Sequence, residues 1–116
     1  KGVLMMTYIY LITTFEKMNG KCEYGYLDVG DRRSVGWFPT FKGAERRVKN
    51  NTCDLWETCY DYAVIERIPF GLYPEIGDPN TERWYYKYNV ETNKYELMDE
   101  VPKDFAHYML VLGEIG

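Results

Sequence analysis

The sequence contains one histidine, His107, and only three cysteines, Cys22, Cys53 and Cys59. A lone histidine without a second histidine or an arranged serine excludes a hydrolase triad. The cysteines lack the close pair that is typical of structural zinc sites, and a Cys–His nucleophile would require the fold to bring distant residues together. Neither a GxGxxG fingerprint nor a GxxxxGK[ST] loop is present, which disfavours conventional nucleotide enzymes. We therefore predict no catalytic residue, no metal and no cofactor, and an enzyme ranks third among the alternatives.

Long apolar runs are also missing, because no stretch reaches the roughly 18 residues that a membrane helix needs. The apolar segment from Val3 to Ile12 is interrupted by Thr7 and lacks the small-residue cleavage pattern of a signal peptide. An odd number of cysteines leaves at least one unpaired in a monomer, which favours reduced thiols. We expect a cytoplasmic protein that does not enter a membrane.

The length and balance of residue types are ordinary for one folded domain. The chain has 116 residues, of which 46% are hydrophobic and 28% charged. A chain of this size buries enough surface to fold without disulfide bonds or a structural metal. We predict one domain over residues 1–116. Lys1-Gly2-Val3 can be encoded by a bacterial ribosome-binding sequence just before Met5 and Met6, so we expect residues 1–4 to be a translated leader and the gene to be bacterial or from a phage.

The first third of the chain is rich in β-branched and aromatic residues and predicts strands separated by turns. The predicted strands are Thr7 to Phe15, Cys22 to Leu27 and Ser34 to Phe38, and the predicted turns are Met18-Asn19-Gly20 and Gly30-Asp31. Alternation along the third strand places Val35 and Trp37 on one face.

One helix is predicted from the spacing of Phe41, Ala44 and Val48, at i, i+3 and i+7. Thr40 is a suitable N-cap, and Asn50-Asn51 is a suitable stop. Gly43 lowers the helix propensity by about 1 kcal/mol relative to alanine.

The second half predicts strands again, after an ambiguous segment from Cys53 to Cys59. The predicted elements are a strand from Tyr62 to Ile68, a loop from Gly71 to Thr81, a hairpin of Arg83 to Asn89 with Lys94 to Met98, and a last strand from Tyr108 to Leu112. The fold class is therefore α+β: a single compact domain with a mainly antiparallel sheet of about five to six strands and one principal helix, at about residues 40–50, packed on it.

Several short segments carry a family resemblance. They are Val35-Gly36-Trp37-Phe38, Ala44-Glu45, Val48 to Asn51, Tyr62-Ala63-Val64-Ile65-Glu66, Gly71-Leu72-Tyr73-Pro74, Trp84-Tyr85 and Ile115-Gly116. Over about the last two-thirds of the chain, this pattern resembles small uncharacterised proteins of Firmicutes and their phages. The resemblance implies a bacterial or prophage origin and a common fold, and it implies no active site because that family has no settled activity.

Charge is divided unevenly along the chain. Residues 1–53 carry a balance of +4 and residues 54–116 a balance of −8. The basic excess gathers in six residues: Arg32, Arg33, Lys42, Arg46, Arg47 and Lys49. A solvated helix face with a charged turn is one interpretation. The other is an anion site, where Arg32 or Arg33 and the N-terminal amides of the helix hold a phosphate.

Aromatic residues make up 17% of the chain, including twelve tyrosines and three tryptophans. Alternation puts Trp84, Tyr86 and Tyr88 on one face of a strand and Tyr85 on the other. Core and cross-strand packing is one interpretation, and a surface on which a ligand stacks is the other. The candidate stacking residues are Tyr24, Tyr26, Trp37, Tyr85 and Tyr86.

Two functions follow from these features. The first is a non-catalytic binding protein that sequesters a small anionic, nucleotide-type ligand as a counter-defence protein, using Arg32, Arg33, Lys42 and Arg46 beside the aromatic residues. The alternative is an inhibitor of a host enzyme that docks through the acidic second half, including Asp54, Glu57 and Asp61. Direct binding to nucleic acid is not expected at a pI of about 5.0, and a homo-oligomer formed through a sheet edge stays open.

Overall fold

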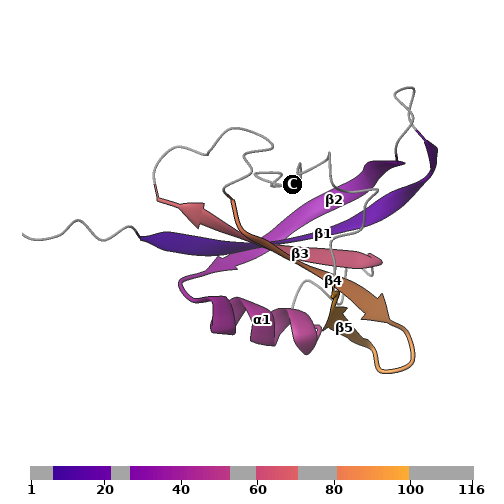
Figure 1. Ribbon diagram of the computed structural model, residues 1–116. Helices are drawn as coiled ribbons and strands as arrows, with labels where there is room; N and C mark the ends of the chain where they lie inside the picture. Colours follow the sequence, from indigo (N-terminus) through magenta and orange to yellow (C-terminus); the bar gives the residue numbers. More distant parts are fainter. Residues whose placement is uncertain (1–6, 22–26, 53–59, 71–80, 100–116) are drawn as a thin grey trace, which may run out of the picture.

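The computed structural model describes residues 7–21, 27–52, 60–70 and 81–99. These residues form a five-stranded antiparallel sheet with one helix packed on it, which confirms the α+β fold (Figure 1). The elements in chain order are β1 (Tyr8–Lys21), β2 (Leu27–Phe38), α1 (Phe41–Lys49), β3 (Tyr62–Pro69), β4 (Arg83–Asn89) and β5 (Lys94–Leu97). In space the strand order is β2-β1-β3-β4-β5.

Strand β3 is the centre of the sheet and is apolar on both faces. Its residues Ala63, Val64 and Ile65 are fully buried, as expected for a strand covered on both sides. It pairs with β1 from Tyr8↔Pro69 to Phe15↔Tyr62 and with β4 on its other side. The predicted strand at 62–68 is thereby confirmed.

Helix α1 matches its predicted bounds. The Thr40 side chain accepts a hydrogen bond from the Gly43 N–H at 3.0 Å, and the Asn50 N–H donates to the Arg46 carbonyl at 3.1 Å. Both ends are therefore satisfied by local partners. No helix in the described residues is long and apolar enough to cross a membrane.

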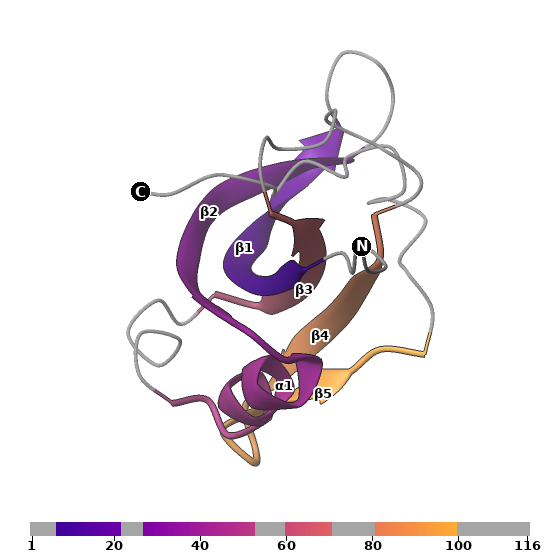
Figure 2. The same cartoon turned by 90° about the vertical axis from the view of Figure 1, so that its left-hand side faces the viewer.

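The sheet separates two clusters of buried side chains. The cluster on the α1 side contains Ile12, Ala44, Val48, Ala63, Ile65, Tyr86 and Tyr95, and the cluster on the opposite face contains Phe15, Val64 and Tyr85. Figure 2 shows α1 against one side of the strongly twisted sheet. Trp84 and Tyr88 pack on the cluster that contains Tyr86, so the alternation predicted for β4 is confirmed.

Two predicted turns are wrong. β1 continues through residues 18–20 to Lys21, and β2 continues through Gly30-Asp31 as one strand. The reason is tertiary, because Lys17 pairs with Val29 and Lys21 pairs with Leu27, with register shifts between these pairs. Long-range pairing therefore overrides local turn chemistry.

The prediction that Val35 and Trp37 share a face is also wrong. Ile12 pairs with Gly36 and Thr13 pairs with Ser34, which leaves Val35 as an extra residue in β2. Such a bulge shifts the alternation by one position. Val35 consequently packs on the α1-side cluster, whereas Trp37 is 60% exposed.

The β4–β5 hairpin around residues 90–93 is confirmed. Four other predictions lie outside the described residues: the strand at 22–26, the segment 53–59, the loop at 71–80 and the strand at 108–112.

Candidate binding groove

The basic residues whose side chains the structure describes do not converge on the N-terminus of α1. Arg33 is exposed on β2, five residues before Phe38, which corresponds to about 17 Å along a strand. At the helix itself, the Gly43 amide is already bonded to Thr40. Lys42 and Arg46 are exposed one turn apart on α1. The structure therefore brings Lys42 near Arg46 but keeps Arg33 away from both.

Arg32 pairs with Phe15 in the β1–β2 ladder, and its side chain is outside the described part. Arg47 lies over the Phe38 ring at 5.7 Å, a distance that allows a cation–π contact. The ring anchors this guanidinium beside the strand that leads into α1.

The aromatic candidates divide between core and surface. Tyr85 and Tyr86 are buried, and the Tyr86 hydroxyl donates to Glu45 Oε2 at 2.7 Å. Burial raises the pKa of Tyr85 to about 12 and, with the hydrogen bond to Glu45, raises that of Tyr86 further. Both side chains stabilise the fold, so we leave them out of a ligand surface. Trp37 is exposed, and Tyr24 and Tyr26 lie outside the described residues.

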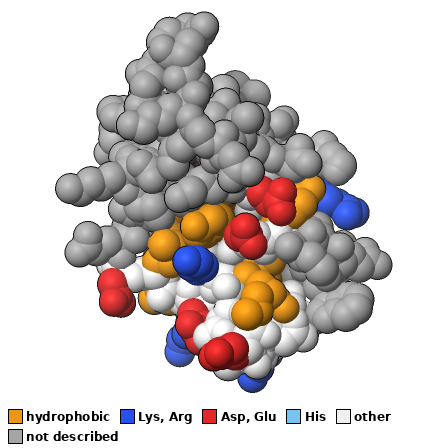
Figure 3. Space-filling model, turned by 90° about the vertical axis from the view of Figure 1, so that its right-hand side faces the viewer, with side chains coloured by type: hydrophobic (Ala, Val, Ile, Leu, Met, Phe, Trp, Pro, Cys, Tyr) orange, Lys and Arg blue, Asp and Glu red, His pale blue; other side chains and the backbone are white. Residues whose placement is uncertain are grey.

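A groove between the C-terminal end of α1 and β5 has a volume of about 610 Å³. Its lining comprises Lys49, Asn50, Thr92, Lys94, Tyr95, Glu96 and Leu97. The volume lies in the range that small ligands occupy in proteins. Figure 3 views the end of the molecule that carries the β4–β5 turn, where apolar, acidic and basic side chains are interspersed.

Comparison with known proteins finds no matching family model, no similar curated protein and no similar solved structure.

Hydrogen bonds between α1 and the β4–β5 hairpin hold the two walls of the groove together. Asn51 adopts a left-handed conformation (φ 50°) just after the helix, and its Nδ2 donates to the Asn93 carbonyl at 3.3 Å. Asparagine is one of the few residues that tolerate this conformation. The floor is fixed by Tyr95, whose hydroxyl donates to the Tyr60 carbonyl at 2.6 Å. The groove is consequently preformed.

The charge in the groove is positive by a small margin. The lining of the groove includes two lysines, Lys49 and Lys94, and one carboxylate, that of Glu96, which accepts a hydrogen bond from Asn89 Nδ2 at 3.1 Å. Lys49 also lies 3.6 Å from Glu45. The C-terminal carbonyls of α1 oppose an anion, so the two lysines must supply the attraction.

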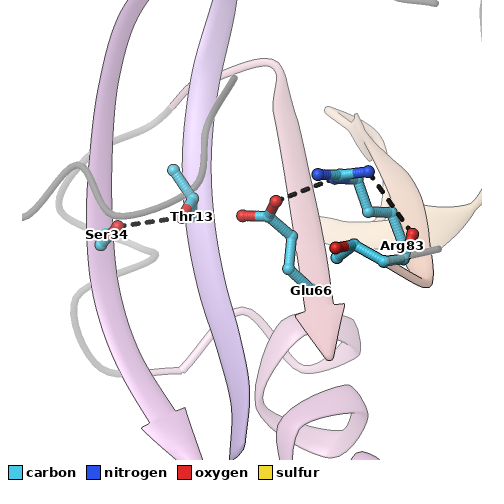
Figure 4. A network of polar contacts seen from close by, with 5 residues as sticks. Thr13, Ser34, Glu66 and Arg83 are labelled. Atoms are coloured by element: carbon cyan, nitrogen blue, oxygen red, sulfur yellow. Dashed lines mark hydrogen bonds and ion pairs between the residues drawn. The ribbon is translucent and has the colours of Figure 1, made fainter. Parts of the chain in front are cut away.

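A second polar cluster lies on the sheet face opposite α1 (Figure 4). Arg83 Nε donates to Glu66 Oε2 at 2.9 Å, and both side chains are almost fully buried. Thr13 and Ser34 share a hydrogen bond at 3.0 Å on the neighbouring strands. Among the described residues, Glu66 Oε1 has no hydrogen-bond partner, and it points away from Arg83, toward the side where Thr13 and Ser34 lie.

Sequence reasoning missed both the groove and the buried pair. Lys49 was one of the six predicted basic residues. Lys94 and Asn50 were not predicted as site residues, because only the contact of α1 with β5 brings them to one groove. The histidine and the three cysteines lie outside the described residues, as do Asp54 and Glu57. Within the described ranges, no group of three metal-ligating side chains gathers.

Proposed function

We propose that this protein is a non-catalytic binding protein that holds an anionic ligand in the groove between α1 and β5. The observation that supports the proposal is the pair Lys49 and Lys94, which two different elements bring to one preformed cavity of about 610 Å³. Charge-assisted hydrogen bonds from lysine to phosphate or carboxylate are stronger than neutral ones. Asn50 and Thr92 add neutral groups that can bond the same ligand.

The small molecules that we propose as ligands are of the nucleotide type, in keeping with the counter-defence role expected from the sequence. The test is a thermal-shift series with ATP, ADP-ribose, a cyclic dinucleotide and inorganic polyphosphate. A ligand at a hundred times its dissociation constant stabilises the folded state by about 2.7 kcal/mol. The expected result is a raised melting temperature with at least one of them.

The matched variants share the same change of net charge. Lys49→Gln with Lys94→Gln removes the cations of the groove, whereas Lys42→Gln with Lys87→Gln removes two exposed lysines that do not line it. The first pair should abolish the ligand-induced shift and the second should preserve it. If both double variants lost the ligand-induced shift equally, the effect would come from overall charge, and the groove would not be the site.

The alternative, an inhibitor that docks through its acidic second half, stays a prediction, as does the bacterial or phage origin. Of the three carboxylates expected to carry it, Asp61 lies in the described part and is exposed. This alternative predicts that Asp61→Lys weakens capture of a basic partner and leaves the ligand-induced shift unchanged.

A further inference from the structure

The groove runs along the outer edge of β5. Four consecutive residues, Lys94 to Leu97, line it, although successive side chains of a strand point to opposite faces. The feature that four successive residues have in common is their backbone, which here forms the edge of the strand. In the described part of the chain, β5 is the last strand of the sheet and pairs with β4 alone.

The register shows which backbone groups face the groove. The Met98 N–H donates to the Tyr85 carbonyl at 2.9 Å, and residues that bond the same neighbour alternate along an antiparallel strand. Lys94 and Glu96 therefore bond to β4, whereas Leu97 turns its N–H and carbonyl toward the groove. The Leu97 side chain is 47% exposed, so an occupant would reach both its backbone and its apolar surface.

The groove offers a nucleobase little to stack on. The aromatic residue among its lining is Tyr95, which is buried with its hydroxyl bonded to the Tyr60 carbonyl. Exposed Trp37 belongs to β2, at the opposite end of the strand order, four strand spacings or about 19 Å away when measured along the sheet. Base binding without a sequence-specific code depends largely on aromatic stacking. An extended peptide instead needs an accessible strand edge, which this groove has.

Charge decides between a second copy of the chain and a different partner. Pairing of two β5 edges about a two-fold axis would bring the C-terminal ends of both α1 helices together. The last turn of α1 carries Arg46, Arg47 and Lys49, and the two sets would repel each other. A segment with carboxylates is instead attracted to the cations of this helix end and to Lys94.

We propose that an extended acidic segment of a partner protein binds here as an added strand on β5. Its backbone bonds to the N–H and carbonyl of Leu97, an apolar side chain on the α1 side covers Leu97, and its carboxylates lie on the other side, near Lys94. This inference rests on the proposed function of the groove as an anion site, and it names the class of ligand.

The test measures fluorescence anisotropy of a short labelled peptide that alternates glutamate and valine. Two control peptides are used: one replaces glutamate with lysine, and one keeps the glutamates but carries N-methyl groups on alternate amides. Strand addition requires both charge and backbone hydrogen bonds. The alternating peptide should bind, and each control should bind roughly tenfold more weakly or not at all.

Variants of Leu97 test the same contact from the protein side. Leu97→Pro removes the N–H that faces the groove and leaves the bonds to β4 in place, which edge strands tolerate. Leu97→Ala shortens the side chain and keeps that N–H, so it is the matched control. Peptide binding should be lost in the first and largely kept in the second, with urea unfolding confirming that both are folded. If Leu97→Pro does not fold, the N-methylated peptide decides alone.

Four outcomes would overturn the inference. Equal binding of the N-methylated peptide would show attraction by charge alone, and the proposed function would stand. Binding of nucleotides but not of peptides would rule out strand addition. If the Lys49 and Lys94 double variant also lost nucleotide binding, the proposed function would still stand. A dimer in sedimentation that Leu97→Pro dissociates would assign the edge to a second copy. If neither peptides nor nucleotides bind, both proposals fail.

Discussion

Glu66 is a side chain whose protonation near neutral pH depends on folding. It is fully buried in the central strand, and within the described part of the chain its carboxylate is bonded through one oxygen, to Arg83. Burial raises the pKa of Glu66 from 4.5 to about 7, although Arg83 acts in the opposite direction. Between these two values the folded protein retains a proton that the unfolded chain releases.

The free energy of unfolding should therefore decrease as pH rises from 4.5 to about 7. The contribution of Glu66 is complete below 4.5 and is lost by the time the folded-state pKa is passed. A shift of this size corresponds to about 3 kcal/mol. Urea unfolding across this pH range measures it, with Glu66→Gln as the comparison because its amide does not titrate. A slope in Glu66→Gln equal to that of the wild type would assign the dependence to other groups.

The sequence contains a weak signal for this residue and none for its partner. Glu66 is the single carboxylate of its strand, and it directly follows the apolar residues Ala63 to Ile65. A carboxylate in a buried strand requires a hydrogen bond or an opposite charge beside it. Arg83 lies 17 positions later, and only the β3–β4 register places it opposite. The faces of Tyr85 and Tyr86 followed from alternation, but their degree of burial depends on what covers each face.

At the scale of elements, local signals predicted α1 and the β4–β5 hairpin with nearly correct bounds. The cap at Thr40, the apolar spacing of the helix and the polar turn at 90–93 all act within a few residues. β1 and β2 were predicted too short, because their length comes from pairing with each other across 14 and 12 residues. Bulges and register shifts in this pair carry no local sequence signature.

The N-cap provides a prediction for α1. Thr40→Ala removes the acceptor of the Gly43 N–H and should lower the free energy of unfolding by about 1 kcal/mol. Thr7→Ala, at an exposed position outside α1, should change it by less than about 0.5 kcal/mol. Urea unfolding of the two variants checks the difference. Equal effects would mean that the cap contributes nothing specific.

At the scale of the whole molecule, the strand order β2-β1-β3-β4-β5 could not be predicted from the sequence. It places β3 between two strands that are distant in the chain, and it seats α1 over the sheet near β5. The candidate groove exists because of this arrangement, since one wall is the end of α1 and the other is the edge of β5. Its integrity should therefore depend on the packing of α1, and far less on the opposite face of the sheet.

Two buried valines test this dependence. Val48 packs α1 onto the sheet, whereas Val64 lies in the cluster on the other face, and both are fully buried. Each valine-to-alanine change should destabilise the fold by roughly 2 kcal/mol, because each leaves a similar cavity. Only Val48→Ala loosens the wall that carries Lys49, so only this variant should weaken ligand binding, measured by anisotropy at a temperature where both variants are folded. Equal weakening in both would show that binding follows global stability and that the position of α1 has no separate effect.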